Sequence, residues 1–218
     1  MIHNLSQTDS LAQQFVAELR DVNIQKDRMR FRRNIERLGE IAAIEISKKL
    51  EWESYEVTTP LGVANCRRLK EQPILATILR AGLPLHQGLL NYFDQADNAF
   101  IAAYRKHDVN DEDAFTINME YVTSPSLNDR ALIIADPMLA TGQSIVETVK
   151  KLQVIGKPSH IHIVAAIAST EGIAYVKQHL TNITIWVGAI DEELTAKAYI
   201  VPGLGDAGDL AFGEKMQD

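Results

Sequence analysis

The feature that most constrains the fold is an apolar run followed by a polar loop and an amphipathic segment, within residues 128–155. Residues 131–135 are wholly apolar and end at Asp136, which predicts a strand buried on both faces. Residues 143–155 then predict a helix with one apolar side. The apolar residues that recur there at helical spacing are Ile145, Val149, Leu152 and Ile155.

The loop between this strand and this helix, residues 136–144, carries the groups that a phosphate ligand needs. It offers the Asp136 carboxylate, the hydroxyls of Thr141 and Ser144, and Gly142, which lets a ligand approach the main chain. The helix start adds unpaired N–H groups and the positive end of a dipole, which favour an anion. An ordinary strand-to-helix turn capped by Thr141 or Ser144 fits this stretch equally well, so both interpretations stay open.

The composition narrows the class of protein. The 218 residues include 22 Lys and Arg against 29 Asp and Glu, and the net charge of −7 argues against a nucleic-acid groove or an anionic membrane partner. The lone Cys66 cannot form an internal disulfide, and no Cys/His spacing typical of zinc is present. The first residues lack the basic start and apolar core typical of a signal peptide, and no run approaches about 20 apolar residues. We expect a cytoplasmic protein with one sizeable domain.

Two helices are expected near the N-terminus, one capped within residues 8–10 and a longer one from about 26 to 50. The second carries a basic cluster of Arg28, Arg30, Arg32, Arg33 and Arg37. We interpret the cluster as a solvated or subunit-facing surface, because Glu36 and Glu40 are interleaved with it. A β-hairpin follows, rich in β-forming residues on both sides of a Pro-Leu-Gly turn.

After the hairpin, apolar strands alternate with helices. Strands are expected at 74–79, 99–104, 132–135, 161–168 and 183–187, and helices at 84–93, 143–155 and 171–180. This alternation predicts an α/β fold with a central, mostly parallel sheet flanked by helices. Ligands of such sheets bind beyond the carboxyl ends of the strands. Arg80, Arg105 and Asp136 each follow a strand end, so we expect them to converge on one crevice.

The segment after Tyr104 is polar, and residues 115–123 then alternate between apolar and polar. A polar loop followed by an edge ribbon is the arrangement of a lid over a crevice. A plain solvated hairpin has the same pattern, and the residues do not decide between the two.

Four segments resemble uracil phosphoribosyltransferases, a family of the type I phosphoribosyltransferases, and the resemblance extends over nearly the whole chain. They are Ile78-Leu-Arg-Ala-Gly-Leu83, Tyr104-Arg105, Asp136-Pro-Met-Leu-Ala-Thr-Gly-Gln-Ser144 and Ala198-Tyr-Ile-Val-Pro-Gly-Leu-Gly-Asp-Ala-Gly-Asp209. In order, they look like the family's diphosphate loop, the arginine at the base of its mobile loop, its ribose-5-phosphate loop and its uracil-binding segment. The resemblance implies the type I phosphoribosyltransferase fold.

The resemblance also implies a layout for the chain. We expect one phosphoribosyltransferase domain over residues 1–218, with N-terminal helices in 1–52, a β arm in 53–70 and a catalytic α/β core in 71–218. A comparable arm packs between subunits in the family, which implies a homodimer or a higher homo-oligomer.

The site residues that the resemblance implies fall into two groups, with Asp136, Arg80 and Arg105 as catalytic residues. Phosphoribosyl diphosphate would be bound by Arg80, Ala81, Gly82, Arg105, Asp136, Pro137, Met138, Leu139, Ala140, Thr141, Gly142, Gln143, Ser144 and Asp206. Uracil would be bound by Ala140, Tyr199, Ile200, Gly205, Asp206 and Ala207. Guanidinium groups suit phosphate oxygens, Asp136 can accept hydrogen bonds from two ribose hydroxyls, and Gly82 would let main-chain amides approach the diphosphate.

The implied reaction forms UMP and diphosphate from uracil and 5-phospho-α-D-ribose 1-diphosphate, in nucleobase salvage. Mg²⁺ would be held mainly by oxygens of the substrate, so no dedicated protein metal cage is expected. A nucleotide effector is a further partner that this class of enzyme allows.

Two departures from the family pattern leave alternatives open. Gln143 stands where the family usually has a second glycine, and residues 106–113 lack the acidic-threonine run usual in the mobile loop. A catalytically weak nucleotide-sensing or regulatory paralogue would keep the phosphate loop and lose the lid. A phosphoribosyltransferase for another nucleobase is the second alternative, although Tyr199 to Asp209 favours uracil.

Overall fold

The computed structural model describes residues 1–108 and 111–215, with the backbone alone for residues 103–120. The strands of its central sheet are β1 (Ile2–Asn4), β4 (Ile74–Leu79), β5 (Asp97–Asp108), β6 (Asp111–Thr123), β7 (Ala131–Ala135), β8 (Met138–Leu139), β9 (His160–Ser169) and β10 (Ile183–Asp191). Two small hairpins lie outside the sheet, β2 (Trp52–Thr59) with β3 (Gly62–Leu69) and β11 (Glu193–Leu194) with β12 (Ile200–Val201).

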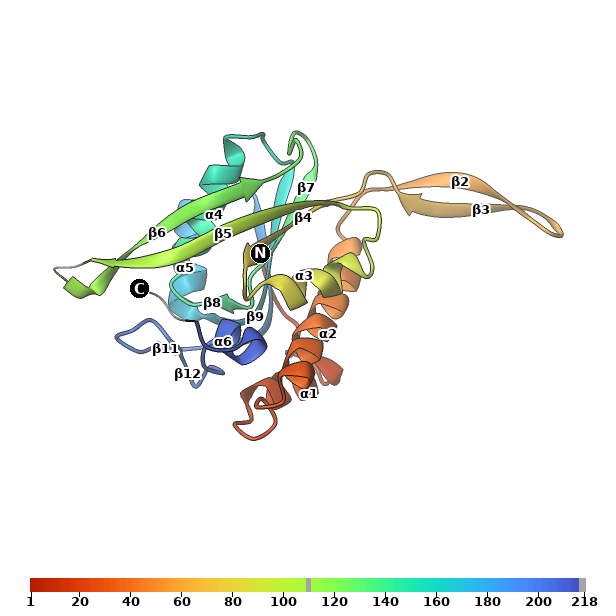
Figure 1. The fold of residues 1–218 in the computed structure, drawn as a ribbon. Helices are drawn as coiled ribbons and strands as arrows, with labels where there is room; N and C mark the ends of the chain where they lie inside the picture. Colours follow the sequence, from red (N-terminus) through yellow and green to blue (C-terminus); the bar gives the residue numbers. More distant parts are fainter. Residues whose placement is uncertain (109–110, 216–218) are drawn as a thin grey trace.

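Within the described residues, the sheet has the order β1-β10-β9-β7-β4-β5-β6, with β8 beside β9 (Figure 1). All neighbouring strands are parallel except β5 and β6, which form an antiparallel hairpin at one edge. The β2–β3 arm and the end of the β5–β6 hairpin project from opposite sides of the molecule. The predicted α/β fold with a mostly parallel sheet is therefore confirmed.

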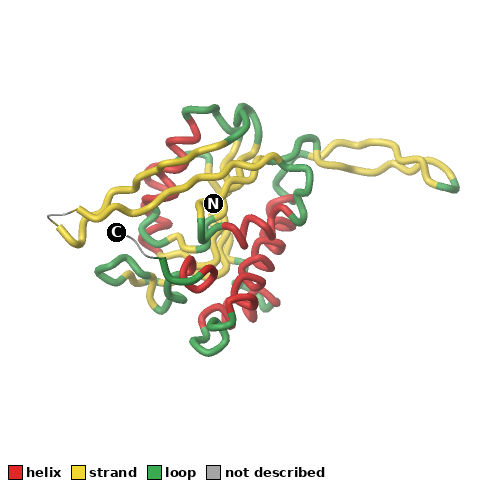
Figure 2. The backbone as a smooth tube through the Cα atoms, viewed as in Figure 1, coloured by secondary structure: helices red, strands yellow, loops and turns green. Residues whose placement is uncertain are grey.

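Helices cover both faces of the sheet (Figure 2). One face packs against α1 (Leu11–Arg20), α2 (Arg28–Ser47), α3 (Leu83–Leu90) and α6 (Ala207–Phe212), and the other against α4 (Gln143–Gln153) and α5 (Thr170–His179). Successive strand residues point to opposite faces, so Ile133 joins the first core while Leu132 and Ile134 join the second. This explains why the strands are apolar throughout. None of the described helices is long and apolar enough to cross a membrane.

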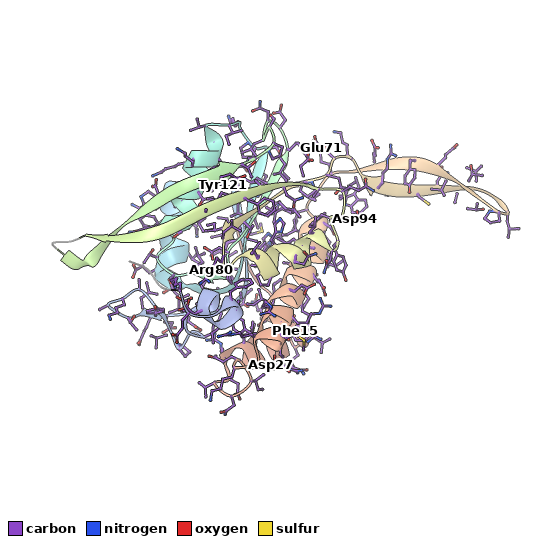
Figure 3. The ribbon with its side chains drawn as sticks, viewed as in Figure 1. Phe15, Asp27, Glu71, Arg80, Asp94 and Tyr121 are labelled. Carbon is purple, nitrogen blue, oxygen red and sulfur yellow. The ribbon has the colours of Figure 1, made fainter. Side chains whose placement is uncertain are left out.

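The N-terminal helices begin at the expected type of residue. Ser10 caps α1, and Asp27 caps α2 by accepting hydrogen bonds from two first-turn amides. Figure 3 marks Asp27 at the start of α2. α2 crosses α3 closely, since a Cβ on Gly88 would lie 1.9 Å from the Glu36 carbonyl oxygen.

Arginines of the basic cluster on α2, which we interpreted as a solvated or subunit-facing surface, make contacts within the chain. Arg30 pairs with Glu18 at 2.7 Å, and Arg32 donates to the Ala211 carbonyl at 2.7 Å. Arg33 pairs with Glu36 at 2.6 Å. The contacts of Arg30 and Arg32 fix α2 against α1 and α6, and Arg33 pairs within α2 itself.

Several expected boundaries were wrong. The helix expected to reach residue 155 ends at Gln153, and Ile155 is exposed instead of lying on its apolar side. The segment expected as a polar loop after Tyr104 is strand on both sides of residues 109–110, which lie outside the described residues. The segment 1–52, expected to be helical, also contains β1, which joins the central sheet beside β10.

β1 is held to the sheet edge by an aromatic cluster. His3 of β1 stacks on Trp186 of β10 at 4.1 Å between ring centroids. The Trp186 indole N–H donates to Nδ1 of the buried His162 at 3.1 Å. Burial, together with the nearby His160 and His3, lowers the pKa of His162 to about 3. His162 is therefore neutral in the folded protein at neutral and mildly acidic pH.

This depressed pKa predicts a pH dependence of stability. Below the ordinary value of 6.5 the unfolded chain protonates His162, while the folded chain does not until about pH 3. The free energy of unfolding should thus fall as the pH falls through this window, by up to ~1.4 kcal/mol per pH unit from this residue. His162→Asn keeps an acceptor for Trp186 and should flatten the dependence measured by urea unfolding. The exposed His179→Asn is the matched control, and equal pH dependence of the two variants would contradict the prediction.

Candidate active site

The candidate site lies where the neighbouring strands β4 and β7 end. Thr77 pairs with Ala135 in the sheet, so the loops that begin at Arg80 and Asp136 emerge side by side. A Cβ on Gly82 would lie 2.2 Å from the Thr77 hydroxyl oxygen and 2.6 Å from the Ala135 carbonyl oxygen. The loops of Arg80 and Asp136 therefore begin at neighbouring strand ends, while their contact with one ligand stays a prediction.

Gly82 has a packing role in addition to the ligand-binding role expected of it, which stays a prediction. Its amide already donates to the Ile78 carbonyl at 3.0 Å, so this amide is engaged within the chain. Glycine is required because the start of α3 packs directly against the end of β7, with no space for a side chain.

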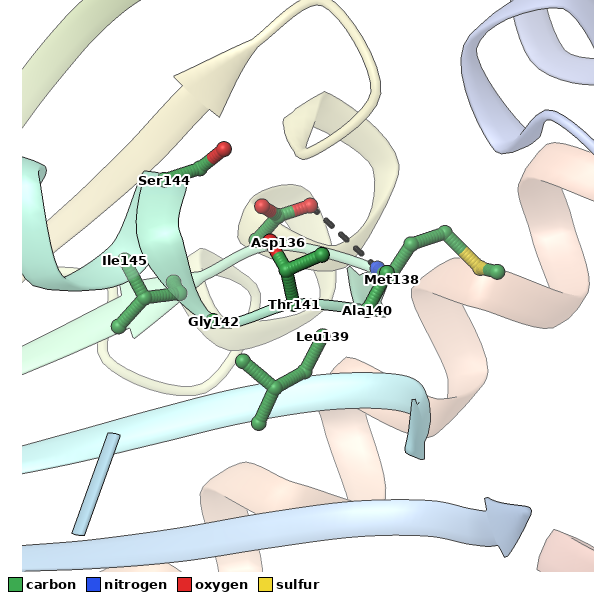
Figure 4. Close-up of a pocket in the computed structure, with 8 residues that line it drawn as sticks. All are labelled: Asp136, Met138, Leu139, Ala140, Thr141, Gly142, Ser144 and Ile145. Atoms are coloured by element: carbon green, nitrogen blue, oxygen red, sulfur yellow. Dashed lines mark hydrogen bonds between the residues drawn. The ribbon is translucent and has the colours of Figure 1, made fainter. Parts of the chain in front are cut away.

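The loop after β7 encloses a small pocket (Figure 4). Its lining residues are Asp136, Met138, Leu139, Ala140, Thr141, Gly142, Ser144 and Ile145. Gly142 has a φ of 79°, which suits glycine, and it begins α4 without a side-chain cap. The Met138 amide donates to Asp136 at 3.4 Å, and the Gln143 amide to the Thr141 hydroxyl at 3.4 Å. Carboxylate, hydroxyls and a helix start therefore share one pocket.

Part of this loop is fixed to the sheet. The Pro137 carbonyl accepts hydrogen bonds from the amides of Ala166 and Ile167, both at 3.0 Å, and Met138–Leu139 form β8 beside β9. The Leu139 side chain is buried in the core, so only its main chain can face a ligand. Neither Pro137 nor Gln143 lines the described pocket, and Gln143 therefore does not fill it.

Arg80 is positioned to bind an anion. It directly follows β4, and the Leu79–Arg80 peptide is cis. Its side chain is 43% exposed, and among the described residues its hydrogen bonds are long, 3.4 Å to the Asp209 carboxylate and 3.4 Å to the Gly213 carbonyl. Such weak contacts cost little to exchange for contacts with a phosphate group.

The C-terminal segment completes the site through α6. Asp206 caps α6 by accepting from the Asp209 amide at 2.9 Å, and the Lys215 ammonium lies 2.9 Å from Asp206 and 3.3 Å from Asp209. Burial alone would raise the pKa of Asp206, but Lys215 and the amides of Asp209 and Gly208 hold this pKa below its ordinary value. Asp206 is therefore ionised.

Lys215 was not among the predicted site residues. It lies six residues beyond the recognised C-terminal segment, and no motif marks a single lysine near a chain end. Only its charge, close in sequence to two aspartates, could have indicated the contact.

The predicted uracil-binding residues other than Ala140, which lines the pocket after β7, lie on a segment clamped from two sides. Asp191, paired with Arg20 at 2.7 Å, accepts from the Gly203 amide at 2.9 Å, and Arg20 donates to the Gly203 carbonyl at 2.9 Å. Tyr199 is exposed, whereas Ile200 and Ala207 are buried, and Gly205 has a φ of 97°. The Ile200 side chain packs in the core, so this position would offer its main chain to a ligand.

The structure brings together two of the three predicted catalytic residues and the segment around Asp206. A Cβ on Gly208 would lie 3.8 Å from the Ala81 Cβ, which places the C-terminal segment directly against the Arg80 loop. Arg105 lies on β5, the strand beside β4, but its side chain is outside the described residues. Its contact with the site stays a prediction.

The parallel sheet, the long edge hairpin and the loops at the strand ends have the arrangement of a type I phosphoribosyltransferase. The family model for uracil phosphoribosyltransferase matches residues 6–214. A uracil phosphoribosyltransferase of Porphyromonas gingivalis is 54% identical over 217 residues, covering 99% of each chain. One of Methanothermobacter thermautotrophicus is 38% identical over 185 residues, covering 84% of this chain and 83% of the relative. A solved structure of a protein from Aquifex aeolicus superimposes with a TM-score of 0.86 at 30% identity, covering 98% of each chain.

The chain belongs to the uracil phosphoribosyltransferase family. It is a pentosyltransferase that transfers a phosphoribosyl group to uracil, which confirms the function expected from the four sequence segments.

Proposed function

We propose that UMP forms at the ends of β4 and β7, with the phosphoribosyl donor lying across the loops of Arg80 and Asp136. The observation that carries this proposal is the convergence of the cationic Arg80, the pocket of residues 136–145 and the segment of Asp206 at one edge of the sheet. The 5-phosphate would lie at the start of α4, and the diphosphate at Arg80. Arg105 would reach the diphosphate from β5.

Each group then has a role in the transfer. The ribose centre gains positive charge while the bond to diphosphate breaks, so the enzyme must hold the sugar and stabilise the leaving group. Asp136 would accept hydrogen bonds from the ribose hydroxyls, and Arg80 would balance charge on the departing diphosphate. Uracil would bind the main chain of Ile200 and Gly205, where the small, buried Ala207 leaves room for a ring.

If Asp136 holds the ribose, Asp136→Asn should lower kcat/KM by about a hundredfold, because an amide is a weaker acceptor for two hydroxyls. The variant is isosteric, so its unfolding midpoint should match that of the unmodified enzyme. UMP formation from radiolabelled uracil measures the effect. The control is Asp94→Asn, an exposed aspartate far from Arg80 in Figure 3, which should retain full activity. Unchanged activity of Asp136→Asn would remove Asp136 from the site.

We also propose that Mg²⁺ acts as the cofactor and is held mainly by the donor's diphosphate. Among the described residues, no group of three or more His, Cys, Asp or Glu could hold a metal ion. A hard cation would instead bind phosphate oxygens and would neutralise part of the diphosphate charge.

A substrate-held metal predicts that two measurements respond differently to chelation. EDTA should reduce UMP formation to background, and added Mg²⁺ should restore it. The unfolding midpoint of the enzyme without substrate should not change with EDTA, since no protein cage would lose its metal. A midpoint that falls in EDTA would indicate a metal bound by the protein itself.

We further propose that two copies associate through the β2–β3 arm. The arm projects from the body of the molecule (Figure 1), and its tip carries Leu61, which is 100% exposed, beside Val63, which is 65% exposed. Trp52 and Tyr55 add exposed aromatic surface along it. A second copy of the chain is the partner that would cover this surface.

Removing this apolar surface should therefore dissociate the assembly. Leu61→Asp combined with Val63→Asp places two charges at the tip of the arm and should shift the sedimentation profile from dimer to monomer. Val154→Asp, at an exposed position after α4, is the matched control and should remain dimeric. A double variant that sediments as the unmodified protein does would contradict the arm as the interface.

The remaining expectations are consistent with this proposal. We propose one domain over residues 1–218, because α1, α2 and α6 share one core with the sheet. We place the enzyme in the cytoplasm, where the free Cys66 would stay reduced. A panel of nucleobases in the same assay distinguishes uracil from another base, and activation by a nucleotide can be scored in parallel.

A further inference from the structure

A buried serine outside the predicted site contacts the phosphate loop. Ser169 ends β9 and caps α5, and its side chain is fully buried. Its hydroxyl donates to the Ala140 carbonyl at 2.5 Å and accepts from the Gly172 amide at 2.8 Å. This side chain thus joins the loop to the start of α5, because its hydroxyl both donates and accepts a hydrogen bond.

The contact with Ala140 determines where the next amide points. The described cis peptides are Leu79–Arg80 and Val201–Pro202, so the Ala140–Thr141 peptide is trans and planar. In a trans peptide the carbonyl and the N–H point in opposite directions. Because the Ala140 oxygen is held toward the buried Ser169, the Thr141 N–H points away from the core, toward the pocket that both residues line.

Close packing holds the same peptide from a second side. A Cβ on Gly172 would lie 2.1 Å from the Ala140 carbonyl oxygen, and a Cβ on Gly142 would lie 2.7 Å from the Gly172 oxygen. The first turn of α5 therefore contacts the loop backbone directly. Without the Ser169 hydroxyl, the Ala140 oxygen would lose its buried donor, and packing against Gly172 alone would restrain the orientation of this peptide.

We propose that Ser169 is a positioning residue for the phosphoribosyl donor, which orients the Thr141 amide toward the 5-phosphate without touching the substrate. The inference rests on the proposed site, because it requires the 5-phosphate at residues 140–144. Ser169 would therefore affect the binding of only the ribose-5-phosphate half of the donor. The diphosphate half lies at Arg80, on the neighbouring loop, and does not depend on this serine.

Binding of two half-ligands tests this assignment. Titration calorimetry with ribose 5-phosphate should show an affinity about tenfold weaker for Ser169→Ala than for the unmodified enzyme, the size expected for one hydrogen bond to a charged group. Affinity for inorganic diphosphate and the KM for uracil should stay within about twofold. Ser169→Ala binding ribose 5-phosphate as tightly as the unmodified enzyme, or weakening both half-ligands equally, would overturn the proposal.

A control variant at another helix cap distinguishes the positioning role proposed for Ser169 from its role as a helix cap. Ser10 caps α1 by accepting from the Ala12 amide at 3.3 Å, so Ser10→Ala also loses a helix cap and should lower the unfolding midpoint. Ser10→Ala should bind ribose 5-phosphate normally. A tenfold loss in Ser10→Ala would show that reduced stability alone explains the effect, and the proposal would fail.

A second variant disturbs the same peptide without changing Ser169. Gly172→Ala places a methyl group against the Ala140 oxygen and should produce the same selective loss of ribose 5-phosphate. Normal binding by Gly172→Ala would count against the proposal. If Asp136→Asn lowers turnover while Ser169→Ala binds normally, only the role of Ser169 is wrong. If neither variant has an effect, the proposed site itself is wrong.

Discussion

The active site depends on main-chain segments that pack closer together than any side chain would allow. Gly82 brings the start of α3 against the end of β7, and Gly172 brings the start of α5 against the Ala140 carbonyl. Both contacts occur at the carboxyl edge of the sheet, where loops from different strands must share little space. The site is therefore assembled by backbone packing, and the charged side chains are placed on that frame.

Much of this frame could be predicted from the sequence, for a physical reason. Strands buried on both faces require apolar runs such as residues 131–135, and the helices between them require one apolar side. β1 and β8 could not be predicted, because three and two residues are too few to show a period. Their pairing comes from long-range partners, such as Trp186 stacked on His3.

The candidate site was predictable to the extent that its residues follow strand ends. Arg80 and Asp136 follow neighbouring strands, β4 and β7, an order that no local pattern encodes but that the resemblance implied. The burial of Leu139 and Ile200 was not foreseen, since apolar residues in a loop look alike whether they face a ligand or the core. Ser169 and Lys215 were not predicted for another reason: their contacts depend on tertiary structure alone.

The clamp of Arg20 and Asp191 on Gly203 links the beginning of the chain to its end. An N-terminal helix thus helps to set the conformation of a segment almost the whole chain length away. A hybrid enzyme whose N-terminal helix lacked an arginine at position 20 would therefore lose this clamp on the C-terminal segment. Recombination within this family should preserve the pairing of these two regions more strictly than their separation in sequence suggests.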